Sequence, residues 1–182
     1  MNEIKNVCVF CASAMGARAE YAADAEELGR TLAARGIGLI YGGAKVGLMG
    51  VVADATLNAG GRVVGVIPQL LVDHEVAHQG VTELHIVKTM HERKSLMGEL
   101  ADGFIILPGG RGTFEELFEV LAWQTLRIHD KNVVLLNTAG FYDPLLAFLD
   151  HCVREGTMNA AKREIVLIAK KVDEALELLT KN

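Results

Sequence analysis

Apolar runs rich in β-branched residues alternate with amphipathic stretches along the whole chain. Most of the apolar runs are continuous, which is typical of parallel strands that are covered on both faces. We expect strands at residues 7–10, 38–41, 63–67, 84–87, 104–107, 133–136 and 165–168. Between them, apolar residues at helical spacing predict helices at residues 20–35, 48–59, 90–100, 113–128, 143–155 and 173–181.

Helix start and stop signals agree with this division of the chain. Asp143-Pro144 reads as an N-cap followed by proline at the first helical position, and Gly36 and Gly60 follow two predicted helices. Alternation of strands and helices predicts an α/β fold: a doubly wound parallel sheet of about seven strands, with helices on both faces. We see no linker or repeat and expect a single domain over residues 1–182. Ligands in such folds bind beyond the carboxyl ends of the strands.

Composition narrows the class of protein further. The 182 residues are 51% apolar and 23% charged, as in ordinary soluble proteins, and the net charge of −5 argues against a broad nucleic-acid surface. No apolar run reaches the roughly 20 residues of a membrane span, and the early first strand leaves no room for a signal peptide. Three cysteines, an odd number without framework spacing, fit a reducing compartment, so we expect a cytoplasmic protein with neither nucleic acid nor membrane as partner.

Three predicted strands end in turns of glycine and other small residues. The turns read Cys-Ala-Ser-Ala-Met-Gly at 11–16, Gly-Gly-Ala-Lys-Val-Gly-Leu-Met-Gly at 42–50 and Pro-Gly-Gly-Arg-Gly-Thr-Phe-Glu-Glu at 108–116. In the third, glycines let the backbone approach an anion, the helix N-terminus offers free N–H groups, and Thr113 can add a hydroxyl and cap the helix. Alternatively, these glycines only permit tight turns. Because neither Gly-x-Gly-x-x-Gly nor the P-loop pattern is present, we expect a monophosphate ligand.

Two pairs of charged residues accompany the third turn. Glu115 and Glu116 fall in the first turn of the predicted helix and point about 100° apart, so one can face the cleft and the other solvent or a neighbouring helix. Their ordinary structural use is to favour the helix dipole. Arg93 and Lys94, near the start of the preceding helix, oppose that helix's dipole unless an anion compensates. The alternative for them is a pair of solvated surface cations.

At these residues the chain resembles the LOG (Lonely Guy) family of cytokinin riboside 5′-monophosphate phosphoribohydrolases, often mislabelled as lysine decarboxylases. The Pro-Gly-Gly-x-Gly-Thr-x-x-Glu motif is matched at 108–116, the Arg-Lys pair at 93–94 and Gly-Leu-Met-Gly at 47–50. The resemblance runs from residue 7 to about residue 158. It implies a Rossmann-like fold, a homodimer with the site near the subunit interface, and neither a metal nor an organic cofactor.

The resemblance also implies roles for individual residues. Arg93 and Glu116 would be the catalytic pair that cleaves the N-glycosidic bond of an AMP-type nucleoside 5′-monophosphate. Glu116 would stabilise an oxocarbenium-like transition state and orient or deprotonate water, while Arg93 would contact phosphate or leaving base. Phosphate and ribose would be held by Lys94, Gly110, Arg111, Gly112, Thr113, Phe114 and Glu115, together with Glu116. We expect further substrate contacts from Ser13, Gly43, Glu75, Met90 and Gly109. The first two turns depart from the family pattern because Ala12 and Ala44 stand where glycine is usual, which could alter affinity or base preference.

Other motifs and functions stay open as alternatives. His74-Glu75-Val76-Ala77-His78 spells the zincin motif but is short and lacks a helical context, so we expect no metal site. Cys8 and Cys11 spell Cys-x-x-Cys, yet Cys8 lies in a predicted strand and reads as a buried apolar residue. Two rival functions remain: a general AMP or purine nucleotide nucleosidase, and a nucleotide-binding sensor without catalysis.

Overall fold

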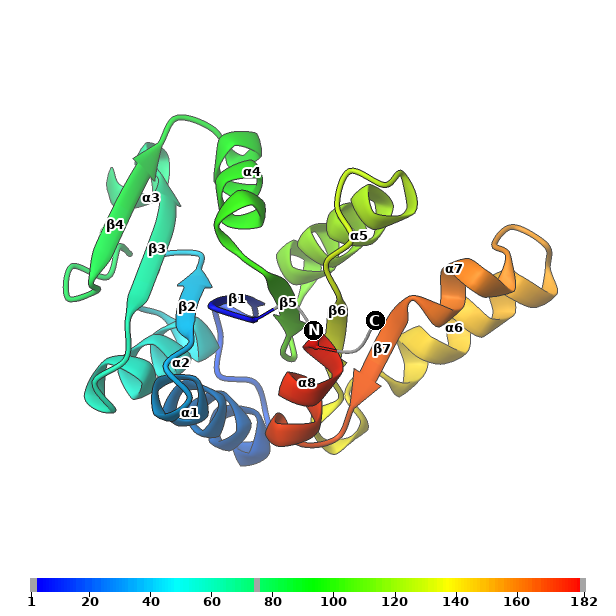
Figure 1. The fold of residues 1–182 in the computed structure, drawn as a ribbon, viewed down its shortest axis with the longest axis horizontal. Helices are drawn as coiled ribbons and strands as arrows, with labels where there is room; N and C mark the ends of the chain where they lie inside the picture. The colour runs from blue at the N-terminus through cyan, green and yellow to red at the C-terminus, as the bar shows by residue number, and fades with distance from the viewer. Residues whose placement is uncertain (1–2, 74–75, 181–182) are drawn as a thin grey trace.

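The computed structural model describes residues 3–73 and 76–180, and within them a single sheet of seven parallel strands forms the centre of the molecule (Figure 1). Its strand order is β4-β3-β2-β1-β5-β6-β7. The predicted α/β fold with a doubly wound parallel sheet is confirmed. The strands are β1 (Asn6–Phe10), β2 (Gly38–Tyr41), β3 (Val63–Pro68), β4 (Glu83–Val87), β5 (Gly103–Ile106), β6 (Val133–Leu136) and β7 (Val166–Ala169).

Helices cover both faces of this sheet, with α1, α2 and α8 on one side and α4 and α5 on the other (Figure 1). Every long predicted helix is present, with ends that differ by at most three residues from those expected. The helices are α1 (Ala19–Ala34), α2 (Gly47–Asn58), α3 (Gln69–Asp73), α4 (Met90–Leu100), α5 (Arg111–Thr125), the 3-10 helix η1 (Thr138–Gly140), α6 (Asp143–Arg154), α7 (Ala160–Glu164) and α8 (Val172–Leu179).

Three of these helices, α3, η1 and α7, were not expected from the sequence. Each spans only three to five residues, too few to show a helical repeat of apolar positions. The expected left-handed residues after α1 and α2 are confirmed, since Gly36 has φ +68° and Gly60 has φ +79°.

The core consists of two apolar layers separated by the sheet. Alternate strand residues face opposite sides: Val7 and Val9 pack with α1, α2 and α8, whereas Cys8 and Phe10 pack with α4 and α5. The central strands β2, β3, β5 and β6 are buried along their whole length, which explains why their sequences are continuously apolar.

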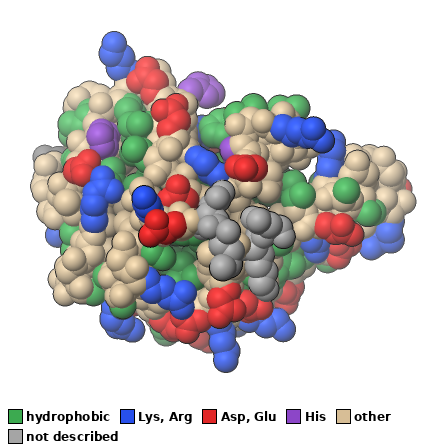
Figure 2. Space-filling view, viewed as in Figure 1, with side chains coloured by type: hydrophobic (Ala, Val, Ile, Leu, Met, Phe, Trp, Pro, Cys, Tyr) green, Lys and Arg blue, Asp and Glu red, His purple; other side chains and the backbone are tan. Residues whose placement is uncertain are grey.

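No helix in the described part of the chain is long and apolar enough to cross a membrane. Acidic and basic side chains are interspersed over the face seen in Figure 2, in line with the net charge of −5.

Candidate functional site

A cavity of about 520 Å³ lies beyond the carboxyl ends of the central strands. The cavity lies where the strand order reverses, since β2 to β4 extend to one side of β1 and β5 to β7 extend to the other. Its walls come from the turns after β1, β2 and β5, the start of α5, and single residues of α3 and α4. This is the switch-point position at which doubly wound folds bind ligands.

The turns that build the cavity hold one another through their backbones. The N–H of Ala12 donates to the carbonyl of Pro108 over 3.1 Å, and the N–H of Leu48 donates to the carbonyl of Ala12 over 3.1 Å. Gly47, with φ +55°, lies so close to the backbone of Ser13 and Ala14 that a Cβ there would overlap them. Glycine at the head of the Gly-Leu-Met-Gly motif is therefore required for the first and second turns to meet.

Helix α5 begins at Arg111, two residues before the predicted start, and its N-cap is Gly110. The expectation that Thr113 caps the helix is therefore wrong, as is the placement of Glu115 and Glu116 in its first turn. Thr113 instead packs under the preceding turn, where a Cβ on Gly109 would overlap its hydroxyl group. Gly110 and Gly112 have low helix propensity, which favours a later start, whereas in the structure only residues 107–110 separate β5 from α5.

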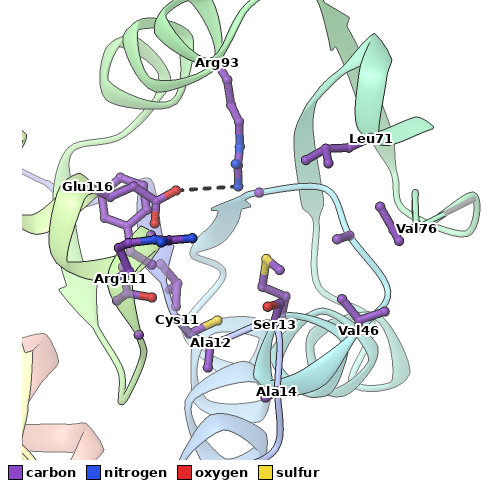
Figure 3. Close-up of a pocket in the computed structure, with 18 residues that line it drawn as sticks. Cys11, Ala12, Ser13, Ala14, Val46, Leu71, Val76, Arg93, Arg111 and Glu116 are labelled. Carbon is purple, nitrogen blue, oxygen red and sulfur yellow. Dashed lines mark ion pairs between the residues drawn. The ribbon is translucent and has the colours of Figure 1, made fainter. Parts of the chain in front are cut away.

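Arg93 and Glu116 meet at the cavity wall (Figure 3). Both residues are 7% exposed, and Arg93 Nη2 lies 3.6 Å from Glu116 Oε1. The guanidinium passes directly over Gly42, where a Cβ would overlap Nη2. Among the described residues, none accepts a hydrogen bond from the buried Nε of Arg93. The guanidinium therefore retains donor capacity for a ligand.

Burial raises the pKa of Glu116 to about 7, against the lowering influence of Arg93. Glu115 adds to the rise, and Lys94 opposes it. A carboxyl group that titrates near neutrality can accept and return a proton, as a general acid–base catalyst must.

Glu115 and Lys94 lie outside the cavity lining. The side chain of Glu115 is 54% exposed, and it forms an ion pair with the buried Lys94 of α4. The two neighbouring glutamates thus diverge, as their angular separation on a helix predicts, with Glu116 at the cavity and Glu115 towards α4.

The side of the cavity opposite Glu116 is apolar. Figure 3 shows Val46, Leu71 and Val76 across the cavity from Glu116 and Arg111. The Val76 segment is anchored by hydrogen bonds from Lys45 N–H to the Val76 carbonyl, 2.8 Å, and from His78 N–H to the Gly43 carbonyl, 2.8 Å. Sequence reasoning did not find this wall, because single apolar residues on three different elements leave no motif.

The other expected substrate contacts divide into two groups. Those that line the cavity are Ser13, Gly110, Arg111, Gly112 and Thr113. Those placed outside the lining are Gly43, Met90, Lys94, Gly109, Phe114 and Glu115, while Glu75 lies outside the described residues. Both departures from the family pattern, Ala12 and Ala44, line the cavity.

The remaining motifs have structural roles where they are described. His74 and Glu75 of the zincin-like motif fall outside the described residues, while His78 is buried and pairs through Nε2 with Asp54 Oδ1 over 2.9 Å. Within residues 3–73 and 76–180, no cluster of three or more His, Cys, Asp or Glu side chains could hold a metal ion. Cys8 is fully buried in β1, as predicted.

Comparison with known proteins places the chain in a family. The family model described as "possible lysine decarboxylase" matches residues 49–179. A cytokinin riboside 5′-monophosphate phosphoribohydrolase of Rhodococcoides fascians is 49% identical over 94% of this chain and 87% of its own. The enzyme of the same name, LOG, from Oryza sativa subsp. japonica is 48% identical over 95% of this chain and 72% of its own.

A solved structure supports the fold independently. The Moco carrier protein of Chlamydomonas reinhardtii has a TM-score of 0.71 at 21% identity, over 96% of this chain and 94% of that one. At this identity the similarity shows the fold alone. The sequence matches over nearly the whole chain confirm the resemblance carried by the glycine turn and the Arg-Lys pair, and the chain belongs to the LOG family of cytokinin riboside 5′-monophosphate phosphoribohydrolases.

Proposed function

We propose that this protein hydrolyses the N-glycosidic bond of N6-modified adenosine 5′-monophosphates, releasing the free base and ribose 5-phosphate. The observation that carries the proposal is the buried Arg93–Glu116 pair at the wall of a cavity that also receives the N-terminus of α5. The names of relatives at 48–49% identity support the same activity.

The phosphate would bind at the start of α5. Gly110, Arg111, Gly112 and Thr113 line the cavity there, and the first N–H groups of a helix have no partner within the helix. Gly110 and Gly112 have open space where a Cβ would lie, so an anion could approach the backbone closely. The exposed Arg111, which reaches across the cavity in Figure 3, adds a positive charge.

The base would lie towards the apolar wall. Val46, Leu71 and Val76 supply apolar surface on that side of the cavity. Burial of an apolar N6 substituent against this surface would make the free energy of binding more favourable, whereas the unsubstituted amino group of AMP would gain no affinity from it. This argument favours an N6-modified nucleotide over plain AMP.

Hydrolysis would depend on Glu116 between these two subsites. The C1′–N bond to the base breaks through an oxocarbenium-like transition state, and a C1′–O bond forms with water. The Glu116 carboxylate would stabilise the positive charge on the ribose and take a proton from the attacking water. A pKa near 7 lets the same group pass that proton to the departing base.

We further propose a cytoplasmic homodimer. Free cysteines at positions 8, 11 and 152 fit a reducing compartment. Exposed apolar side chains on and beside α5 and α6, namely Phe118, Leu126, Ile128 and Phe148, offer surface for a second copy. Size-exclusion chromatography with light scattering tests this: the mass of two chains is expected, and a single-chain mass at micromolar concentration contradicts it.

Product analysis separates the candidate functions. Purified protein is incubated with N6-isopentenyl-AMP, AMP and N6-isopentenyladenosine, and base and ribose 5-phosphate are quantified. We expect equal amounts of both products from the modified nucleotide, and at least about 100-fold lower kcat/KM for the nucleoside, which lacks the phosphate anchor. Equal turnover of AMP would indicate a general nucleosidase, and binding without products would indicate a sensor.

A further inference from the structure

Lys94 is almost completely buried although it lies next to the cavity and not in its lining. Its side chain is 4% exposed. The ammonium group pairs with Glu119 Oε2 over 2.9 Å and with Glu115 Oε1. Both carboxylates belong to α5, whereas Lys94 belongs to α4. A buried ammonium group is costly unless its charge is compensated, so these two carboxylates are what stabilises it there.

We propose that Lys94 is a positioning residue that clamps α4 to α5, and that it does not bind the substrate phosphate. This inference rests on the proposed function, because it assigns a role within the same site. Arg93 and Lys94 are neighbours on α4, and Glu115 and Glu116 are neighbours on α5. The two helices are thus bridged twice, by Arg93–Glu116 at the cavity and by Lys94–Glu115 beside it.

The geometry of the cavity pair explains why a second bridge is needed. At 3.6 Å, the contact between Arg93 and Glu116 is longer than a good hydrogen bond, so it fixes the helices only weakly. Glu115 and Glu119 are one helical turn apart on α5 and both pair with Lys94, so two contacts tie the ammonium group of α4 to α5. Figure 1 shows α4 and α5 on the same face of the sheet and inclined to each other.

The clamp also controls the charge around Glu116. Glu115 and Glu119 raise the pKa of Glu116, and Lys94 lowers it. Removing Lys94 leaves the two glutamates uncompensated and should raise the pKa of Glu116, whereas removing Glu119 should lower that pKa. The other titratable and charged groups that act on or face the Glu116 carboxyl are Arg93 of α4, Arg111 of α5, Cys8 of β1, and Cys11 of the turn after β1.

A double-mutant cycle tests the clamp. The variants are Lys94→Met, Glu119→Gln and both together, with Lys88→Met, an exposed lysine just before α4, as the matched control. Ribose 5-phosphate affinity is measured by calorimetry, and kcat and KM for N6-isopentenyl-AMP are measured from pH 5 to 9. We expect Lys94→Met to lower kcat about tenfold at pH 7, to change ribose 5-phosphate affinity by less than about twofold, and to move the rising limb of kcat/KM to higher pH.

Glu119→Gln is expected to move that limb to lower pH, and the double variant to return it towards the wild-type position. A loss of ribose 5-phosphate affinity of about tenfold or more in Lys94→Met, not restored in the double variant, would show a phosphate ligand and overturn the proposal. If Lys94→Met does not fold, the pH dependence of kcat/KM in Glu119→Gln tests the clamp, because an unchanged profile in that variant contradicts it.

Failure of the proposed function is distinguishable from failure of the clamp. Without any base release by the wild-type protein, urea unfolding still measures whether the effects of Lys94→Met and Glu119→Gln on stability are coupled. Additive effects would overturn the clamp, whereas coupled effects without hydrolysis would support the clamp and refute the hydrolase.

Discussion

Replacing Glu116 by glutamine is expected to make the protein more stable while removing its activity. Burial raises the pKa of this carboxyl from 4.5 to about 7, so the folded state disfavours its ionised form. A rise of that size lowers the free energy of unfolding by about 3 kcal/mol at a pH where Glu116 is ionised in both the folded and the unfolded state. Glutamine has nearly the same shape and no charge to desolvate, so the variant avoids this cost.

The effect depends on pH in a defined direction. Because the folded-state pKa is the higher one, the stability that protonated Glu116 contributes is fully present below about pH 4.5 and is lost as pH rises through about 7. Glu116→Gln should therefore gain about 3 kcal/mol in the free energy of unfolding at pH 8, and less than about 1 kcal/mol at pH 4.5.

Urea unfolding at the two pH values and at one fixed protein concentration measures this difference. The control is Glu27→Gln, a change at an exposed glutamate of α1, for which no such gain is expected. Burial of the ionised carboxyl would be refuted as the cause of the stability gain by either of two results. One is a Glu116→Gln variant that is less stable than the wild type at pH 8, and the other is a variant whose free energy of unfolding differs from that of the wild type by the same amount at both pH values.

Three further predictions follow from single contacts of the site. The kcat/KM should rise with pH around a midpoint near 7, because Glu116 must be ionised to accept the proton of water; a profile flat from pH 5 to 9 contradicts this. Gly42→Ala should displace the Arg93 guanidinium, which a Cβ would overlap, and lower kcat at least about tenfold in steady-state assays; wild-type kcat would contradict the placement. Tyr142→Phe should lower the free energy of unfolding by about 1 kcal/mol in urea, because its hydroxyl donates over 2.6 Å to the buried Leu107 carbonyl; no change would show that water replaces it.

The sheet was predictable because its sequence signal is local. A central strand such as β2, GLIY, is apolar at every position because both of its faces are covered, and this pattern can be read without knowledge of the fold. The start of α5 was not placed correctly, because Gly110 and Gly112 have low helix propensity and their use at a helix start depends on tertiary context.

The candidate site was predictable only where chemistry is concentrated in short motifs. Arg93 and Glu116 are 23 positions apart in the chain, and their meeting depends on how α4 and α5 pack on the sheet. Lys94 was expected at the phosphate because the Arg-Lys pair resembles that of the LOG family. It lies outside the cavity lining, since adjacent helix residues point in different directions. Leu71 and Val76 of the apolar wall follow no repeat, so only the folded chain brings them to the cavity.

The most direct test of the account compares binding and hydrolysis in Glu116→Gln. Calorimetry measures its affinity for N6-isopentenyl-AMP, and a single-turnover experiment measures the rate at which the bound nucleotide releases free base. We expect an affinity within about tenfold of the wild type and base release slower by about 10³-fold, because the glycine turn would still hold the phosphate while the proton acceptor is gone. Base release at a near wild-type rate would contradict the assignment of hydrolysis to the Arg93–Glu116 pair.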